Sequence, residues 1–145
     1  MNTYDVLVVG GGAAGLMAAG AALERGLSVC LFDKNRQLGR KVRITGKGRC
    51  NVTNNCPAEE VVAACPRGGK FLYGALSAFS PQDTMAFFEG LGVPLKTERG
   101  RRVFPVSDNA HDIAGALERY AAGATVIREA VTAVLVEKGR AVGVR

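Results

Sequence analysis

The sequence contains one histidine, and its four cysteines include no pair in a C-x-x-C spacing. His111 and the cysteines therefore form no zinc-binding pattern, and we expect no metal site. The sequence also lacks a Ser/His/Asp arrangement, a Cys/His pair and a closely spaced pair of carboxylates. No catalytic residue is predicted from the sequence.

The N-terminus lacks the basic cluster with which a secretory signal peptide begins. Without an export signal, the cysteines are expected to be reduced thiols in the cytoplasm. Residues 6–23 form an uncharged run, but it contains five glycines and many weakly apolar alanines, and Asp5 directly precedes it. These features argue against a membrane span, which needs roughly 20 strongly apolar residues.

No acidic residue lies between Lys34 and Arg49, whereas seven basic residues do. The chain has a formal net charge of +6, and outside this stretch 12 basic residues nearly balance the 13 acidic ones. A local cationic stretch suits a compact anion such as a pyrophosphate better than a long phosphate backbone. Nucleic-acid binding is therefore the less favoured alternative, and steeply salt-dependent tRNA binding would support it.

Residues 1–33 predict a strand, a glycine turn, a helix and a second strand. Apart from Asp5, residues 4–9 form a short apolar run rich in β-branched side chains, the pattern of a strand buried on both faces of a parallel sheet. Residues 13–25 are good helix formers, and Gly26 stands where a left-handed C-terminal cap is expected. Residues 27–32 predict a second buried strand.

The glycine turn matches the G-x-G-x-x-G pattern with Gly10, Gly12 and Gly15. In this pattern the first glycine permits the tight turn, the second admits the pyrophosphate, and the third lets helix and strand pack closely. Asp33 closes the second strand, where an acid accepts hydrogen bonds from the adenosine ribose. The order predicts a dinucleotide-binding unit; the alternative is a glycine-rich turn followed by a solvated charge. Lys34 would favour a 2′-phosphate, but Asp33 would repel it, so an unphosphorylated ribose is expected.

Residues 34–55 predict a basic, glycine-rich loop with neither helical nor strand periodicity, and residues 56–123 a mainly helical region with a short hairpin. Ser80, Pro81 and Asp83 have the pattern of a cap, a first-turn proline and an N3 acid, and they open a helix toward Gly92. The phenylalanines of that helix are interpreted as core residues.

The hairpin is expected around Arg99 and Gly100, followed by a helix that Ser107 or Asp108 caps and that ends near Gly123. Residues 124–145 predict strands, with a turn at positions 138 and 139. The basic side chains at positions 96, 101 and 102 are interpreted as solvated.

The resemblance to a known family rests on "GGGAAGLMAA", "LGRKVRITGKGRCNVTN" and "SAFSPQDTMAFFEGLGVPLKTERGRRVFPVS", in this order. These motifs resemble the HI0933-like, or BaiN-like, flavoproteins, which include NAD(P)/FAD-dependent oxidoreductases and aminoacetone-oxidase-type FAD-binding enzymes. The resemblance covers almost the whole chain. It implies an α/β, Rossmann-like FAD-binding domain of the glutathione-reductase type, with a parallel sheet and an antiparallel hairpin at its C-terminal end.

The same resemblance implies that FAD places its pyrophosphate on residues 10–15, its ribose on Asp33 and its isoalloxazine end near residues 46–51. This chain has Asp33 where members commonly carry Glu, and Thr45 where they commonly carry Ser. Among the basic side chains, those at positions 36, 43 and 47 are expected to be solvated. The expected cofactor-binding residues are Gly10, Gly12, Ala13, Ala14, Gly15, Asp33, Lys34, Arg40, Lys41, Gly46, Gly48, Arg49, Cys50, Asn51 and Val131.

The function implied is that of the FAD-binding portion of a flavin-dependent oxidoreductase, which transfers hydride between a small-molecule substrate and the flavin, with NAD(P)H as a candidate donor. A non-catalytic dinucleotide-binding module and an RNA-modifying flavoprotein are the alternatives. The family continues beyond the last residue of this chain. Residues 1–145 are thus expected to be the N-terminal part of an FAD-binding domain and to lack turnover by themselves.

Overall fold

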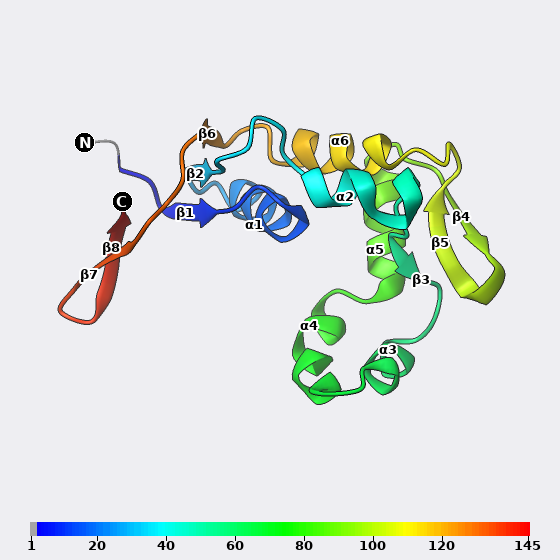
Figure 1. Ribbon diagram of the computed structural model, residues 1–145. Helices are drawn as coiled ribbons and strands as arrows, with labels where there is room; N and C mark the ends of the chain where they lie inside the picture. Colours follow the sequence, from blue (N-terminus) through cyan, green and yellow to red (C-terminus); the bar gives the residue numbers. More distant parts are fainter. Residues whose placement is uncertain (1–2) are drawn as a thin grey trace. The chain divides into compact units, whose positions relative to one another are not determined.

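The computed structural model describes residues 3–145, which divide into two compact units (Figure 1). Unit 1 contains the described residues through Val42 together with Leu117–Arg145, and unit 2 contains Arg43–Ala116. Among residues 3–145, no helix is both long enough and apolar enough to cross a bilayer.

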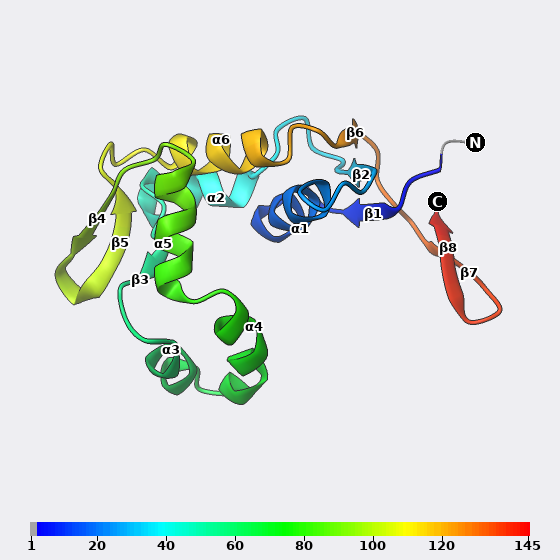
Figure 2. The ribbon, with the colours of Figure 1, turned by 180° about the vertical axis from the view of Figure 1, so that it is seen from behind.

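The centre of unit 1 is a parallel sheet with the strand order β1-β2-β6, formed by β1 (Val6–Val9), β2 (Val29–Phe32) and β6 (Thr125–Ile127). Val6 pairs with Val29, and Cys30 pairs with Thr125. Helix α1 (Ala13–Leu23) connects β1 to β2 and contacts both strands (Figures 1 and 2). The predicted Rossmann-type order of strand, helix and parallel strand is confirmed.

Helix α1 ends as predicted at a left-handed glycine. Gly26 has φ +74°, and its N–H donates to the Leu23 carbonyl oxygen at 2.9 Å. The C-terminal end of α6 (Ala110–Tyr120) packs on α1 through Tyr120. The ring lies so close to Gly20 of α1 that a Cβ added at Gly20 would be 2.1 Å from Tyr120 Cδ1. The Tyr120 hydroxyl donates to Glu24 Oε2 at 2.7 Å, and burial together with this bond raises the pKa of Tyr120 to about 12. Tyr120 is therefore a neutral donor at physiological pH.

The prediction that β1 is buried on both faces is wrong. Val8 is buried, but Val9 is 55% exposed and Leu7 is 36% exposed. Successive side chains of a strand point to opposite faces, and Val8 faces α1, since a Cβ at Gly15 would lie 3.2 Å from Val8 Cγ1. The face that carries Leu7 and Val9 lies away from α1, which explains its exposure.

Unit 2 contains an antiparallel sheet with the order β3-β5-β4, formed by β3 (Thr53–Asn54), β4 (Leu95–Glu98) and β5 (Arg102–Pro105). Strands β4 and β5 are the predicted hairpin, in which Leu95 pairs with Pro105. They are joined by the 3₁₀ turn η3 (Arg99–Arg101), where Gly100 has φ +74°.

The helices of unit 2 are α3 (Ala58–Ala64), α4 (Tyr73–Ala78) and α5 (Pro81–Gly90), and the 3₁₀ turn η2 (Gly69–Leu72) precedes α4. The predicted cap of α5 is confirmed as a capping box: Asp83 N–H donates to Ser80 Oγ at 3.1 Å, and Ser80 N–H donates to Asp83 Oδ2 at 2.8 Å. Phe88 is buried and meets Phe87 edge to face at 5.1 Å between centroids, as expected for core residues.

Residues 34–55 contain more regular structure than predicted. They include α2 (Arg40–Ile44), the 3₁₀ turn η1 (Thr45–Gly48) and β3. A helix of five residues is too short to show a 3.6-residue apolar repeat, and helices of this length depend on tertiary contacts. Strand β3 forms by pairing with β5, in which Thr53 lies opposite Val103.

The predicted cap of α6 is also wrong. Asn109, rather than Ser107 or Asp108, precedes the helix, and its Oδ1 accepts a hydrogen bond from His111 N–H at 3.0 Å. Asp108 has φ +55°, and its carboxylate binds Lys96 at 2.7 Å. The side chain that sequence spacing assigned to the cap thus binds a distant cation.

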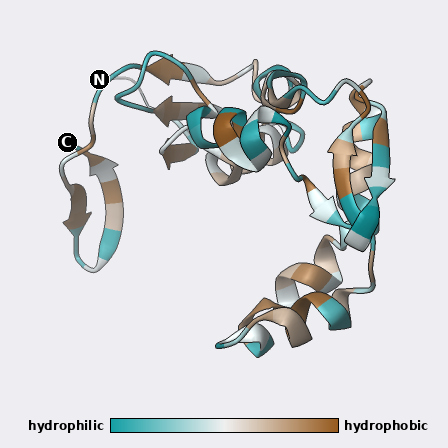
Figure 3. Ribbon diagram, turned by 45° about the vertical axis from the view of Figure 1, so that its right-hand side comes forward, coloured by the Kyte–Doolittle hydropathy of each residue, from teal (hydrophilic) through white to brown (hydrophobic). Residues whose placement is uncertain are grey.

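The chain ends in the predicted antiparallel hairpin, β7 (Val134–Glu137) and β8 (Arg140–Val144). Lys138 has φ +50° and Gly139 φ +76°, the two left-handed residues of a type I′ turn. Figure 3 shows hydrophobic residues along the hairpin, and Val134 and Val136 are both exposed.

Candidate functional site

The turn between β1 and α1 depends on close contact between two glycines. Gly10 has φ +100°, and its N–H donates to the Phe32 carbonyl oxygen at 2.8 Å. A Cβ at Gly15 would lie 1.8 Å from the Gly10 carbonyl oxygen. Gly15 therefore permits the close packing of helix and strand that the sequence pattern predicted.

Gly12 is the N-cap of α1 and lies in open space. Its φ of −81° is accessible to any residue, and an added Cβ would meet no described atom within 4 Å. Within residues 3–145, no side chain caps this helix, and its first turn contains no acidic residue. The first-turn N–H groups, including those of Ala13 and Ala14, therefore remain suited to an external anion. This turn fits the pyrophosphate of a dinucleotide.

Asp33 lies beside this turn, immediately after β2. Its Oδ2 accepts a hydrogen bond from Gly11 N–H at 2.7 Å, and its Oδ1 accepts bonds from Asn35 N–H at 2.7 Å and Asn35 Nδ2 at 2.9 Å. Burial raises the pKa of Asp33, but the bonds from Asn35 and Gly11 and the positive charge of Arg128 outweigh burial and lower it. The carboxylate is therefore ionised at neutral pH, and because each oxygen can accept two bonds, Oδ2 retains capacity for a ribose hydroxyl.

Sequence reasoning included Gly11 only within residues 10–15 and missed its contact with Asp33. Its N–H binds Asp33, and its carbonyl oxygen accepts a bond from Gly39 N–H at 2.7 Å. A Cβ at Gly11 would lie 2.3 Å from Leu38 Cδ2 and 3.1 Å from Asp33 Oδ2. Gly11 thus joins the glycine turn to Asp33 and to Leu38 and Gly39 in the segment after Asp33.

Arg128 is the second residue that sequence reasoning missed. Its Nη1 donates to the Asn35 carbonyl oxygen at 3.1 Å. Because Phe32 of β2 pairs in parallel with Ile127 of β6, Asp33 and Arg128 leave the sheet at the same edge. The spacing of 95 residues between them gave no signal of this proximity.

The predicted cofactor-binding residues fall into two groups. The structure brings Gly10, Gly12, Ala13, Ala14, Gly15 and Asp33 together in unit 1 at the carboxyl ends of β1 and β2. Unit 1 also contains Lys34, Arg40 and Lys41, which are exposed, and Val131, which lies in the connection between β6 and β7. The second group lies in unit 2 and consists of Gly46, Gly48, Arg49, Cys50 and Asn51.

The second group forms a turn with an unusual backbone. Gly46, Lys47, Gly48 and Cys50 all have positive φ angles. A left-handed conformation costs a non-glycine residue about 1–2 kcal/mol, so tertiary contacts must hold Lys47 and Cys50 in place. A Cβ at Gly46 would lie 2.9 Å from Asn51 N. Burial raises the pKa of the Cys50 thiol, which is therefore not an activated nucleophile.

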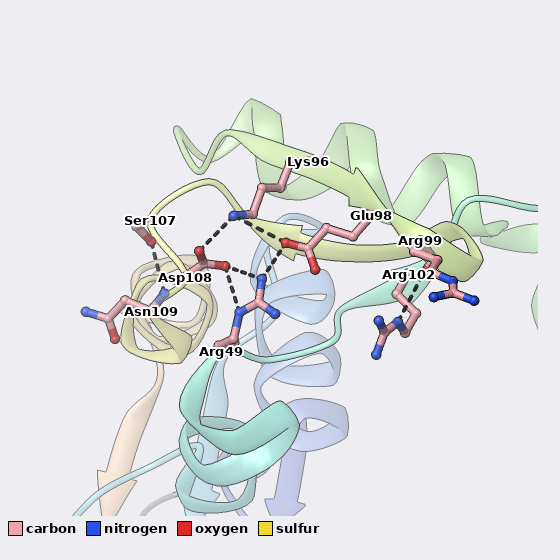
Figure 4. A network of polar contacts seen from close by, with 8 residues as sticks. All are labelled: Arg49, Lys96, Glu98, Arg99, Arg102, Ser107, Asp108 and Asn109. Atoms are coloured by element: carbon pink, nitrogen blue, oxygen red, sulfur yellow. Dashed lines mark hydrogen bonds and ion pairs between the residues drawn. The ribbon is translucent and has the colours of Figure 1, made fainter.

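Arg49 is bound by two carboxylates of unit 2 (Figure 4). Its Nη2 donates to Glu98 Oε1 at 2.5 Å, and its Nε donates to Asp108 Oδ1 at 2.8 Å. The guanidinium lies 4.1 Å from the centroid of the Phe104 ring. Lys96 Nζ completes the network, 2.7 Å from Asp108 Oδ2 and 3.4 Å from Glu98 Oε1. We name these four charged residues and Phe104 the Arg49 network; it connects the left-handed turn to β4, β5 and the segment before α6.

Several side chains that were interpreted as solvated also have partners in the fold. Lys96 belongs to the Arg49 network, and Arg101 Nη1 donates to Glu60 Oε1 at 3.1 Å. Arg102 Nε donates to the Arg99 carbonyl oxygen at 3.1 Å, and Arg43 Nη1 lies 2.6 Å from His111 Nδ1. Most of these partners lie far away in the sequence, so spacing could not reveal them.

We expect Arg49→Ala to lower the melting temperature of the chain at pH 7 more than Lys47→Ala does. Both variants remove one positive charge from the same turn, but only the first removes an observed bond to Glu98 and to Asp108. Differential scanning calorimetry measures both melting temperatures. Equal losses would contradict a structural role for the Arg49 network.

The difference between the two variants should shrink in acid. Arg49 lowers the pKa of Glu98 from 4.5, and Lys96 together with Arg49 lowers the pKa of Asp108 from 3.8. Carboxylates with a lowered folded-state pKa contribute stability above the unfolded-state pKa, and this stability is lost as the pH falls through the folded-state pKa. Melting at pH 7 and at a series of lower pH values tests this, because the stabilisation declines as the pH falls below the unfolded-state pKa values and is lost once both carboxylates are protonated in the folded chain.

Comparison with known proteins supports the same fold. A family model described as the HI0933-like protein Rossmann domain matches residues 4–144. A 3-dehydro-bile acid delta(4,6)-reductase from Clostridium scindens is 36% identical over 115 residues, which cover 77% of this chain and 27% of that protein. A ribosomal RNA dihydrouridine synthase from Escherichia coli is 41% identical over 54 residues, which cover 37% of this chain and 14% of that protein. The matched part of the chain thus spans 14–27% of the length of these curated relatives.

Two solved structures show the same fold at low identity. Sdh1 from Mycobacterium smegmatis, in complex with UQ1, matches with a TM-score of 0.65 and 23% identity over 99% of this chain and 30% of that chain. A geranylgeranyl bacteriochlorophyll reductase-like protein from Thermoplasma acidophilum matches with a TM-score of 0.51 and 22% identity, and the match covers 99% of this chain and 34% of that chain. Because the family model matches almost all of the chain and the glycine turn has the geometry that a Rossmann unit requires, this chain belongs to the HI0933-like protein family, as its Rossmann domain.

Proposed function

We propose that this chain is the FAD-binding part of a flavin-dependent oxidoreductase. The observation that carries the proposal is the open, uncapped N-terminus of α1 at Gly12, beside the ionised carboxylate of Asp33. An anion-binding helix end next to a ribose-binding acid suits a dinucleotide. The family resemblance selects FAD among the dinucleotides.

In this proposal the residues of the chain bind and orient the cofactor. The N–H groups at the start of α1 hold the pyrophosphate, and Asp33 accepts hydrogen bonds from the ribose hydroxyls. Lys34, Arg40, Lys41 and Val131 are proposed as further contacts in unit 1. Bound FAD supplies hydride transfer, which protein side chains cannot provide.

Residues 46–51 are proposed to face the ring end of the flavin. Their left-handed backbone is held by the Arg49 network. The guanidinium of Arg49 already binds Glu98 and Asp108, so its proposed contribution to cofactor binding includes holding this turn in shape.

The proposed reaction is hydride transfer between the flavin and a small organic molecule, with NAD(P)H as the donor. The name of the Clostridium scindens relative, a reductase of a 3-dehydro-bile acid, supports a small-molecule substrate. A cytoplasmic location is also proposed, because Cys30, Cys50, Cys56 and Cys65 are free thiols.

We expect calorimetric titration of the purified chain to show binding of FAD and none of NADP. Asp33 is ionised and half-buried, and it would repel a 2′-phosphate. Arg128 makes the NADP titration the decisive control, because its positive charge acts on Asp33 and could compensate for that repulsion. Binding of NADP as tight as that of FAD would contradict the proposed cofactor, and NAD serves as a third ligand.

Two other functions predict different results. A non-catalytic binding module would retain FAD that no donor reduces. An RNA-modifying flavoprotein is supported by the name of the Escherichia coli relative, but that match covers 54 residues, against 115 for the bile acid reductase. Steeply salt-dependent binding of a ribosomal RNA fragment would favour the RNA substrate over the small molecule.

A further inference from the structure

Unit 2 contains an open pocket of about 460 Å³ beside α3 and β3. Its volume falls in the range of roughly 300–1,000 Å³ that is typical of small-molecule sites. The pocket does not include the glycine turn or Asp33. Its lining residues are Asn51, Thr53, Asn54, Cys56, Glu60, Val61, Ala64, Cys65 and Arg101.

One wall of the pocket is a single face of α3. Val61, Ala64 and Cys65 line it at the spacing that places side chains on one side of a helix. These side chains are small or apolar. Val62 of the same helix is buried and does not line the pocket, so the helix presents different faces to the core and to the pocket.

The polar residues that line the pocket are fixed by hydrogen bonds. With its amide oriented to satisfy hydrogen bonding, Asn51 donates from its side-chain nitrogen to the carbonyl oxygens of Thr53 at 3.0 Å and Val103 at 3.2 Å. Asn54 Nδ2 donates to the Gly100 carbonyl oxygen at 3.4 Å. Thr53 lines the pocket together with these two amides.

The charges of the pocket neutralise each other. Glu60 and Arg101 line it, and the Arg101 guanidinium contacts both carboxylate oxygens of Glu60. A charged ligand would have to replace one partner of this bidentate pair. The pocket therefore favours a neutral ligand over an anion.

We propose that this pocket binds a neutral small molecule with an apolar body and a carbonyl or hydroxyl group. The apolar body lies against Val61 and Ala64. A ligand carbonyl accepts from the Asn54 amide hydrogen that does not bind Gly100, and a ligand hydroxyl can also donate to the Asn51 side-chain oxygen, because both Asn51 amide hydrogens already bind backbone carbonyls. Asn51 also belongs to residues 46–51, which are proposed to face the flavin. The identification of this ligand as the substrate rests on the proposed function, whereas its binding does not.

The test uses Cys65, which is half-exposed in the pocket wall, as the reporter. The probe is progesterone, a neutral fused-ring ketone, and cholate serves as an anionic probe of similar shape. We expect progesterone at about ten times its Kd to slow alkylation of Cys65 by iodoacetamide roughly tenfold, by mass action. Mass spectrometry of the Cys65 peptide measures the rate.

Two neighbouring alanines of α3 provide matched variants. Both are exposed, but Ala64 lines the pocket and Ala63 is not among its lining residues. Ala64→Leu should abolish protection by progesterone, whereas Ala63→Leu should retain it, and circular dichroism checks that both fold.

Equal protection in the two variants, no protection at the solubility limit, or stronger protection by cholate would overturn the proposal. FAD titration of the unmodified chain tests the cofactor separately, so the two failures can be distinguished.

Discussion

Gly15→Ala is expected to lower the free energy of unfolding of the chain by about 3 kcal/mol, at the upper end of the usual range for overpacked sites. The added methyl group would lie 1.8 Å from the Gly10 carbonyl oxygen and 3.2 Å from Val8 Cγ1. The carbonyl is backbone, and Gly10 N–H binds the Phe32 carbonyl oxygen of β2. Relief of the clash must therefore separate α1 from the sheet. Urea unfolding followed by far-UV circular dichroism measures the effect.

Gly12→Ala is the matched control, since it adds the same methyl group three residues earlier. Gly12 has φ −81° and open space around it, so neither strain nor a clash is expected. The loss should stay within about 1 kcal/mol, as for other changes at an N-cap. If the two variants unfold at the same urea concentration, the close contact between Gly10 and Gly15 is not what holds α1 on the sheet.

Gly12→Val is expected to weaken FAD binding about a hundredfold or more while the chain remains folded. The branched side chain would fill the space through which the pyrophosphate approaches the helix end, and each charge-assisted hydrogen bond lost costs about 1.5–3 kcal/mol. Folding should survive because an added Cβ at this position meets no described atom within 4 Å. Calorimetric titration measures affinity, and circular dichroism measures folding.

Gly90→Val is the control for this second experiment. Gly90 lies at the end of α5 in unit 2, and an added Cβ there would also lie in open space. FAD affinity should therefore match that of the unmodified chain. A folded Gly12→Val variant that still binds FAD normally would place the cofactor elsewhere. An unfolded Gly12→Val variant would show that position 12 requires glycine for the backbone conformation rather than for access of the cofactor.

The sequence alone was sufficient where local physical chemistry decides the structure. The order of β1, α1 and β2 follows from β-branched apolar runs around a helix-forming segment. Gly26 and Gly139 stand at left-handed positions because glycine carries no Cβ to oppose them. The capping box of Ser80 and Asp83 needs partners only three residues apart. Each of these features uses neighbours that the sequence displays side by side.

Only the tertiary structure decided the features that join distant residues. Arg49 is separated by 49 residues from Glu98 and by 59 from Asp108, and Asn109 rather than Asp108 caps α6. Gly11 meets Asp33 across 22 residues, and Arg128 reaches the same edge only because β6 pairs with β2. The identity of a residue fixes which bonds it can make, but the choice among partners depends on how the chain brings them together. For this reason the sequence by itself determined the glycine turn between β1 and α1, whereas the fold decided which of the basic side chains have partners.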